Sequence, residues 1–290
     1  MDLVPAQLAA LVAIADHGTF EAAARHLHVT PSAVSQRIRA LESALGRVVV
    51  QRTTPCRPTA DGEVLLRLAR QMQLLHDEVN DALAHSATGV DLPVAVNADS
   101  LATWFRGVVG EVAGWRGVAL RLHVEDQAFS AGLLRSGDVL AAVTSEPAAV
   151  QGCSVERLGT LRYVPAATPE LAARFRRGRG PDWAAMPVVV FNEKDALQHD
   201  VLIARGATPP VVHRVPTSAD FLEAVCLGLG WGMVPEPQLA PAVEQGRLVP
   251  LVTRLHVDVP LHWQRWRLDS PVLDRLTAAV RRAGRSVLRP

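Results

Sequence analysis

The chain has 290 residues, a formal net charge of +1 and a hydrophobic content of 49%. A chain of this length and composition is expected to form two or three globular domains. The near-zero net charge excludes a uniformly basic nucleic-acid-binding protein, although it permits a local basic patch. The three cysteines, Cys56, Cys153 and Cys226, lie far apart and form no CxxC pair, so we expect neither a disulfide framework nor a zinc site.

The N-terminus begins directly with an amphipathic helical pattern and has no basic region of the kind found in signal peptides. No apolar run approaches the ~20 residues that are needed to span a membrane. We therefore expect a soluble cytoplasmic protein that makes no contact with membranes.

Residues 18–46 have the pattern of two short helices joined by a tight turn, after a first helix that ends at Gly18. At the start of the second, Thr30 is placed to cap a helix and Pro31 to be its first residue. Apolar residues then recur at steps of four, three and four, and form one helical stripe. The other side carries hydroxyl, amide and guanidinium groups, which can reach base edges and phosphates. The recognition helix predicted for this helix-turn-helix would contact DNA through Thr30, Pro31, Ser32, Ser35, Gln36, Arg37 and Arg39.

Basic charge is concentrated in the same part of the chain. Residues 20–60 contain six arginines and two glutamates, a net charge of +4, against +1 for the whole chain. A run of valines and two prolines follow the helices and predict a short two-stranded wing, which would present Arg52 and Arg57 to the DNA backbone. The alternatives are an ordinary amphipathic helix pair and a surface loop with two solvated arginines.

Thr59 is placed to cap a long helix, and acidic residues occupy the first turn of that helix. Apolar residues within it follow alternating steps of three and four, the narrow stripe that is typical of a coiled coil. A helix packed in a core can show the same stripe, but the charged flanks argue against burial on all sides. We therefore predict a dimerisation helix whose contacts come from Leu65, Leu68, Met72, Leu75 and Val79.

Residues 86–91 are typical of a hinge, and after them strands alternate with helices. This alternation predicts mostly parallel sheets with helices on both faces, whose ligands bind beyond the carboxyl ends of the strands. The predicted strands are 92–98, 118–124, 139–145, 187–192, 211–215 and 231–235. The predicted helices are 100–112, 129–135, 196–204, 219–227 and 272–280.

Specific motifs recur through the N-terminal ninety residues, namely Thr19-Phe20-x-x-Ala23-Ala24, Thr30-Pro31-Ser32-Ala33-Val34-Ser35, Ile38-x-x-Leu41-Glu42, and Arg52 followed by Pro58-Thr59-x-x-Gly62. With these motifs the chain resembles LysR-type transcriptional regulators. One departure is Val48-Val49-Val50, where many members carry Leu-Phe, and it preserves a strand. The resemblance implies an N-terminal all-α winged helix-turn-helix with a long linker helix, and a C-terminal α/β effector domain of two subdomains like those of periplasmic binding proteins.

On this fold the winged helix-turn-helix domain would span residues 1–59, and the linker helix with its hinge 60–90. The effector-binding domain would span 91–290, with subdomain I at 91–162 and 267–290 and subdomain II at 163–266.

The C-terminal part resembles one branch of that family, the regulators called ArgP or LysG, in residues 97–105, 124–127, 137–168, 191–202 and 221–236. The branch is known for sensing lysine and arginine and for activating the gene of a basic amino acid exporter. The resemblance therefore implies a transcriptional activator without a cofactor, whose effector is lysine, arginine or histidine. It also implies contact with a double-stranded DNA operator and RNA polymerase, and assembly into a homodimer or homotetramer.

A basic amino acid needs hydroxyl groups for its carboxylate and carboxylates for its positive groups. Acidic residues at or near the ends of predicted strands are Asp99, Glu125, Asp126, Glu146, Asp195 and Asp220. Strand-to-helix turns also favour Asp as a helix cap, so each of these acids has a structural alternative. The predicted effector-binding residues are Asn97, Asp99, Ser100, Asp126, Thr144, Glu146, Ser218 and Asp220.

Other functions stay open at this point. One is a solute receptor, which the absence of a signal-peptide pattern disfavours. Others are an architectural or replication-inhibitory DNA-binding protein and a LysR-type regulator with a different effector. No GxSxG motif occurs and the histidines have no metal-ligand spacing, so we predict no catalytic residue, no metal site and no enzyme.

Overall fold

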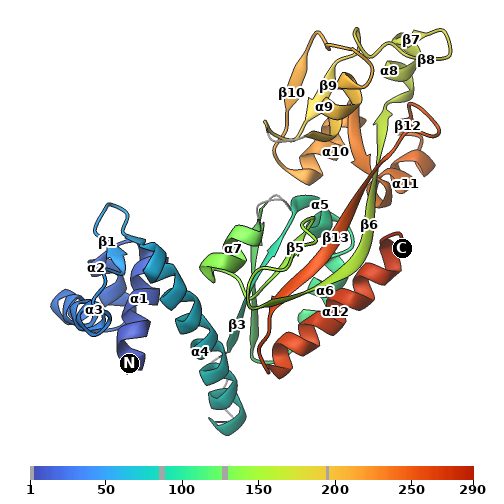
Figure 1. Cartoon of the computed structure of the whole chain (residues 1–290). Helices are drawn as coiled ribbons and strands as arrows, with labels where there is room; N and C mark the ends of the chain where they lie inside the picture. The colour runs from blue at the N-terminus through green and yellow to red at the C-terminus, as the bar shows by residue number, and fades with distance from the viewer. Residues whose placement is uncertain (1–2, 85–88, 126–129, 194–195) are drawn as a thin grey trace.

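The computed structural model describes residues 3–84, 89–125, 130–193 and 196–290. Figure 1 shows a small N-terminal domain, the long helix α4 (Ala60–Ala84), and an α/β part that is divided into two lobes. No helix of the described residues is long and apolar enough to cross a bilayer.

The N-terminal domain is the expected winged helix-turn-helix. It contains α1 (Pro5–His17), α2 (Phe20–His26) and α3 (Pro31–Leu45), and then the antiparallel strands β1 (Val50–Gln51) and β2 (Arg57–Pro58). The Thr19 hydroxyl accepts a hydrogen bond from the Ala22 amide at 3.1 Å and so caps α2, while Gly18 adopts the left-handed conformation that ends α1. Local capping therefore sets both boundaries of the turn between α1 and α2.

Helix α4 begins in direct contact with the wing. The Thr59 hydroxyl accepts a hydrogen bond from the Gly62 amide at 3.1 Å, as expected of a helix cap. A Cβ atom at Gly62 would lie 2.0 Å from the Val49 carbonyl oxygen, so a larger residue would push the helix away from the strand. The Pro58-Thr59-x-x-Gly62 motif thus fixes the angle at which α4 leaves the DNA-binding domain.

The α/β part is built on a mixed sheet with the strand order β11-β6-β13-β5-β3-β4, and β12 pairs with β6 beside that path. Pairs β3–β4 and β3–β5 are parallel, whereas β5–β13, β13–β6, β6–β11 and β6–β12 are antiparallel. The prediction of mostly parallel sheets was therefore wrong. It missed β6 (Cys153–Ala167) and β13 (Val257–Trp266), which pair directly with each other.

These two long strands connect the lobes (Figure 1). Lobe I contains β3, β4 and β5 with α5, α6, α7 and α12, and lobe II contains β9–β12 with α8–α11. The lobe I elements are β3 (Val90–Val96), α5 (Ala98–Ala102), α6 (Arg106–Val112), β4 (Val118–Val124), α7 (Ser130–Ser136), β5 (Ala141–Thr144) and α12 (Pro271–Val287). The lobe II elements are α8 (Pro169–Arg174), β9 (Val188–Val190), α9 (Ala196–Ile203), β10 (Val212–Arg214), α10 (Ser218–Cys226), β11 (Gly232–Pro235), α11 (Glu236–Glu244) and β12 (Val249–Pro250). A hairpin of β7 (Arg176–Arg177) and β8 (Gly180–Pro181) follows α8.

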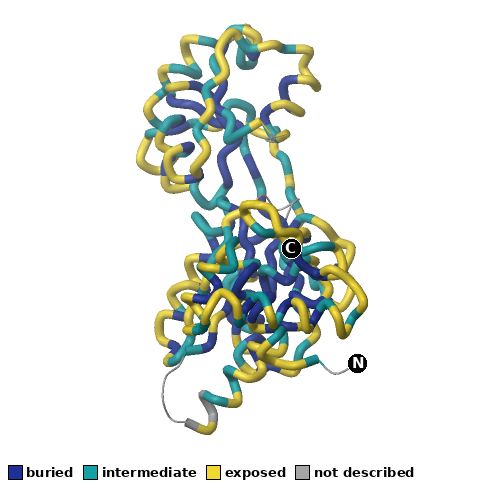
Figure 2. The backbone as a smooth tube through the Cα atoms, turned by 90° about the vertical axis from the view of Figure 1, so that its left-hand side faces the viewer, coloured by how far each residue is buried: buried dark blue, intermediate teal, exposed yellow. Residues whose placement is uncertain are grey.

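Two of the predicted helices differ from the structure by more than one residue at an end. The helix expected over residues 100–112 is split into α5 and α6, because the backbone at Thr103 leaves the helical region and ends α5 there. The last helix runs over Pro271–Val287 rather than 272–280, with the Ser270 hydroxyl capping the Leu273 amide at 3.3 Å. All six tryptophans lie in the effector half and none is more than 8% exposed, as expected of core residues. Figure 2 shows the buried residues gathered inside each lobe.

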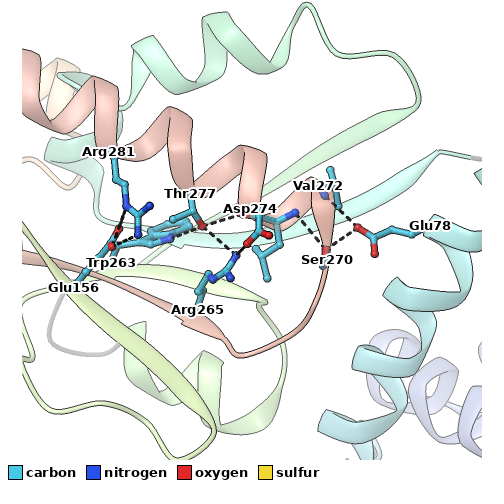
Figure 3. A network of polar contacts seen from close by, with 10 residues as sticks. Glu78, Glu156, Trp263, Arg265, Ser270, Val272, Asp274, Thr277 and Arg281 are labelled. Atoms are coloured by element: carbon cyan, nitrogen blue, oxygen red, sulfur yellow. Dashed lines mark hydrogen bonds and ion pairs between the residues drawn. The ribbon is translucent and has the colours of Figure 1, made fainter.

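Helix α4 is packed against the effector half. Leu74, 3% exposed, joins the core of lobe I. The Glu78 carboxylate accepts hydrogen bonds from the Ser270 hydroxyl at 2.6 Å and the Val272 amide at 3.2 Å, at the start of α12 (Figure 3). A Cβ atom at Gly137 would lie 2.7 Å from the Arg67 Cα atom, so the turn after α7 also lies directly on α4.

A cationic side chain on α4 also bridges the two halves of the molecule. The Arg70 guanidinium pairs with Asp16 of α1 at 2.5 Å and with Asp138, in the turn after α7. The linker helix therefore has fixed contacts both to the DNA-binding domain and to lobe I.

Candidate functional site

The N-terminal domain presents the polar side of α3 to solvent. Val34, Ile38 and Leu41 are fully buried against α1 and α2, whereas Ser32, Gln36 and Arg39 on the same helix are exposed. This pattern is typical of a recognition helix, whose apolar side packs in the domain core and whose polar side can enter a groove of DNA. Ser35 and Arg37 are partly buried.

The first turn of α3 is held by its cap. The Thr30 hydroxyl accepts a hydrogen bond from the Ala33 amide at 3.2 Å and lies 2.9 Å from the Ser32 hydroxyl. Pro31 occupies the first helical position, as the sequence predicts. These residues therefore begin the helix at the end that a helix-turn-helix directs toward bases.

The wing carries its two arginines as exposed side chains. Arg57 lies in β2, and Arg52 follows β1 with its guanidinium carbon 5.4 Å from the centroid of the Phe20 ring. This cation–π contact ties the wing to the start of α2. The wing thus presents two exposed basic side chains of the kind that contact a DNA backbone.

An apolar stripe of α4 is exposed. Leu68, Met72 and Leu75 are 38–40% exposed, and Val79 is 55% exposed. Leu65 differs, because it is only 7% exposed and packs into the core of the N-terminal domain. Leu65 therefore supports the fold of its own chain and is not part of the exposed stripe.

The two lobes meet at a cluster that we call the Asp99 junction, made of Asp99, Tyr163, Ser218 and Gln238. The Asp99 carboxylate, in α5, accepts a hydrogen bond from the Tyr163 hydroxyl at 2.8 Å and another from the Ser218 hydroxyl at 2.7 Å. The Gln238 amide lies 3.5 Å from the Ser218 oxygen. Predicted residues from the two lobes, Asp99 and Ser218, are thus brought into direct contact.

Two neighbours of Asp99 carry buried polar atoms that have no partner among the described residues. The Ser100 hydroxyl is completely buried, and the Asn97 side-chain oxygen lies in a residue that is 4% exposed. A buried polar atom without a hydrogen bond costs free energy, and such atoms are expected where a ligand supplies the partner. The predicted residues Asn97, Asp99 and Ser100 therefore form one polar group beside the junction.

The other predicted effector residues are placed differently. Asp220 is exposed and bonds to the Thr217 hydroxyl, which caps α10, so its described contact is that of a helix cap. Thr144 is buried at the end of β5 and its hydroxyl accepts from the Glu146 amide at 3.0 Å. The exposed Glu146 lines a hollow of about 610 Å³ together with Arg67 of α4. Asp126 and Asp195 lie outside the described residues, as do residues 86–88 of the expected hinge.

Sequence reasoning missed Tyr163, Gln238 and His262. Tyr163 is the single tyrosine of the chain, which was the one signal that could have drawn attention to it. His262 lies opposite Thr144 in the pairing of β13 with β5. Burial, and then the charge of Arg157, lowers the pKa of His262 below its usual value.

Comparison with known proteins covers both halves of the chain. Residues 5–63 match the family described as "Bacterial regulatory helix-turn-helix protein, lysR family", and residues 94–285 match the "LysR substrate binding domain". The chain belongs to the LysR family. Its members combine a helix-turn-helix with an effector domain, and the structure has both of these parts in that order.

Relatives in this family are similar over their whole length. The "Lysine export transcriptional regulatory protein LysG" of Corynebacterium efficiens is 51% identical over 288 residues, which are 98% of this chain and 99% of that protein. The solved structure of full-length LysG from Corynebacterium glutamicum with bound effector Arg is 46% identical, has a TM-score of 0.84, and covers 99% of this chain and 100% of that one. ArgP from Mycobacterium tuberculosis is 43% identical, with a TM-score of 0.87 and 99% of each chain covered.

Proposed function

We propose that this LysR-family protein is a transcriptional activator of a basic amino acid exporter gene and that lysine or arginine, or else histidine, is its effector. The domains proposed for this task are the DNA-binding domain 1–59, the linker 60–90 and the effector domain 91–290. The relatives named LysG and ArgP, and the LysG structure with its bound Arg, support the choice of effector class. A DNA-binding regulator of this kind acts in the cytoplasm and needs no catalytic residue.

The observation that carries the effector assignment is the polar group around Asp99. Its carboxylate lies in the contact between the lobes, and the neighbouring Ser100 hydroxyl is buried without a described partner. A carboxylate suits a positive group, and a hydroxyl suits a carboxylate, so the pair matches the two charged ends of an amino acid. Of the eight predicted effector residues, we propose Asn97, Asp99, Ser100 and Ser218 as the principal effector contacts and Thr144 as an additional one.

DNA is proposed to meet the exposed side of α3 and the wing. Gln36 and Arg39 would read base edges, because an amide and a guanidinium can each make paired hydrogen bonds to a base. Arg52 and Arg57 would contact phosphates, which adds affinity without sequence preference. The remaining polar residues of the first two turns of α3 would position the helix in the groove.

A second copy of the chain is proposed to cover the stripe of Leu68, Met72, Leu75 and Val79. These side chains are large, apolar and partly exposed along one side of α4, which a coiled-coil partner would bury. Two copies would present two recognition helices to two half-sites. Pairs of such dimers would give the tetramer that is the alternative assembly, and the bound regulator would contact RNA polymerase.

Isothermal titration calorimetry of the full-length protein tests the effector assignment. The ligands are lysine, arginine, histidine, glutamate and leucine, each added to the same preparation. Binding that is confined to the basic amino acids is expected, because lysine and arginine bring a second positive group to the acidic junction and histidine does so when its imidazole is protonated. Equal binding of leucine, or silence for all five ligands, would refute a basic effector and favour a LysR-family regulator of another small molecule.

A further inference from the structure

The Asp99 junction connects three parts of the effector half through one carboxylate. Asp99 lies in α5 of lobe I, and Ser218 is the first residue of α10 in lobe II. Tyr163 lies in β6, where it is the register partner of both Val257 in β13 and Pro235 in β11. Tyr163 therefore marks the place where β6 leaves its pairing with β13 and enters lobe II, so the carboxylate contacts lobe I, the connecting strand and lobe II.

The geometry fixes the direction of the carboxylate. The Asp99 Oδ2 atom accepts from Tyr163 and the Oδ1 atom accepts from Ser218, so a rotation of the side chain would break both bonds. Tyr163 is 1% exposed and Ser218 is 7% exposed, whereas Asp99 is only partly buried. Each carboxylate oxygen can accept more than one hydrogen bond, so the bonds from Tyr163 and Ser218 do not by themselves exclude a further donor.

We infer that Tyr163 is a positioning residue that, together with Ser218, holds Asp99 for a positive group of the basic amino acid and couples its binding to the angle between the lobes. This inference rests on the proposed function. The donors reach Asp99 from β6 and from lobe II, so both can do so only at a restricted angle between the lobes. An effector that binds the oriented carboxylate stabilises that angle, because a ligand shifts an equilibrium through its preference for one state.

The role belongs to the hydroxyl rather than to the ring. Phenylalanine at position 163 would fill the same buried space but leave the Asp99 Oδ2 atom without this donor. Alanine at position 218 would remove the other donor and with it the direct bond between the lobes. Loss of either bond is expected to leave the carboxylate present but less well oriented, which weakens effector binding without removing the charge.

Calorimetry with arginine compares the wild type with Tyr163→Phe and Ser218→Ala. Each variant removes one hydrogen bond to a charged carboxylate, so we expect its affinity for arginine to fall roughly tenfold. Thr160→Val is the matched control, because Thr160 lies on the same strand and its hydroxyl accepts from Arg157 at 3.0 Å, apart from the junction. The control is expected to bind arginine as the wild type does, and a thermal melt of each variant confirms that it folds.

The single tyrosine allows a direct measurement on the unsubstituted chain. Protein labelled with 3-fluorotyrosine gives one fluorine NMR resonance, from a ring whose hydroxyl bonds to Asp99. The resonance is expected to shift as arginine saturates the protein, because a positive group at Asp99 changes the charge that the hydroxyl faces. This measurement needs no variant, so it decides the matter even if Tyr163→Phe fails to fold.

Different results would refute the proposed function and the positioning role of Tyr163. If calorimetry detects no basic amino acid binding to the wild type, the proposed function is wrong. If arginine binds the wild type, but Tyr163→Phe keeps full affinity or the fluorine resonance stays unchanged at saturation, the positioning role alone is overturned. Argininic acid, which has a hydroxyl in place of the α-amino group, identifies the positive group at Asp99. An equal loss of its affinity in Tyr163→Phe indicates the guanidinium, and a loss confined to arginine indicates the α-ammonium.

Discussion

Replacement of Glu78 by glutamine is expected to destabilise the effector half, because Glu78 joins the linker helix to the start of α12. One carboxylate oxygen accepts from the Ser270 hydroxyl at 2.6 Å and from the Val272 amide at 3.2 Å (Figure 3). Ser270 is completely buried and also caps the Leu273 amide, so Glu78 completes a cap that the local sequence begins. Glutamine keeps the acceptor oxygen but removes the negative charge.

The magnitude follows from that lost charge. Hydrogen bonds to charged acceptors exceed neutral ones by about 1 kcal/mol, and a charge at a helix N-terminus contributes about 0.3–1 kcal/mol. Glu78 is partly exposed, so we take about 1.5 kcal/mol for the change, which corresponds to a Tm lower by roughly 3–6 °C.

Tryptophan fluorescence during thermal unfolding measures this effect, because every tryptophan of the chain lies between residues 104 and 266 and reports the effector half alone. Glu244→Gln is the control, since Glu244 is an exposed carboxylate at the end of α11. If both variants melt at the same temperature as the wild type, Glu78 does not hold α4 to α12 and the reasoning is refuted.

Three further predictions concern DNA, assembly and pH. Gln36→Ala is expected to cost about 1–3 kcal/mol at a preferred operator and to relax its sequence preference, whereas Arg52→Ala should weaken all DNA equally and reduce the salt slope. Fluorescence anisotropy at several salt concentrations distinguishes these two effects. An unchanged base preference in Gln36→Ala would contradict the proposal that Gln36 reads base edges. Leu75→Asp should dissociate the dimer in sedimentation velocity, whereas Leu227→Asp, at a residue that is 78% exposed, should not; a dimer that survives Leu75→Asp would refute the α4 interface. The Arg162 guanidinium on β6 donates to both carboxylate oxygens of Asp258 on β13, at 2.7 and 2.6 Å. This hydrogen bonding lowers the pKa of Asp258 below its usual 3.8, so the pair's contribution to stability is present above that pH and is lost as the pH falls further. Thermal melts should therefore show a smaller loss on acidification in Asp258→Asn than in the wild type, and equal losses would rule out the pair as a source of acid sensitivity.

The DNA-binding half could be predicted from sequence because its signals are local. Thr30, Pro31 and the stripe of Val34, Ile38 and Leu41 lie within a few turns of one helix, and the structure confirms the cap and the burial. Leu65 shows the limit of such reasoning. It fits the apolar stripe of α4, but it is the neighbouring domain that buries it, and a periodic pattern does not reveal which partner covers each position.

The effector half was predicted less well because its decisive contacts are distant in sequence. Asp99 and Ser218 could be proposed separately from their positions at strand and helix ends, but they are 119 residues apart and nothing local indicates that they touch. Strands β6 and β13 were missed because each follows the preceding strand of the chain, β5 or β12, without the intervening helix that the assumed alternation required. Asp220 had the right residue type at a helix start, and its described contact is that of a cap.

The affinity of the full-length protein for arginine, measured with and without DNA, tests whether this protein is a ligand-responsive DNA-binding regulator. The DNA is a duplex that the protein itself selects from a random pool, so no operator has to be assumed. A ligand-responsive regulator must bind its effector with different affinity in the two cases, because coupling between two sites is reciprocal. We predict that the Kd for arginine changes when the selected DNA is bound. An identical Kd in both cases would show that the effector and DNA sites are uncoupled, and would rule out regulation of DNA binding by arginine.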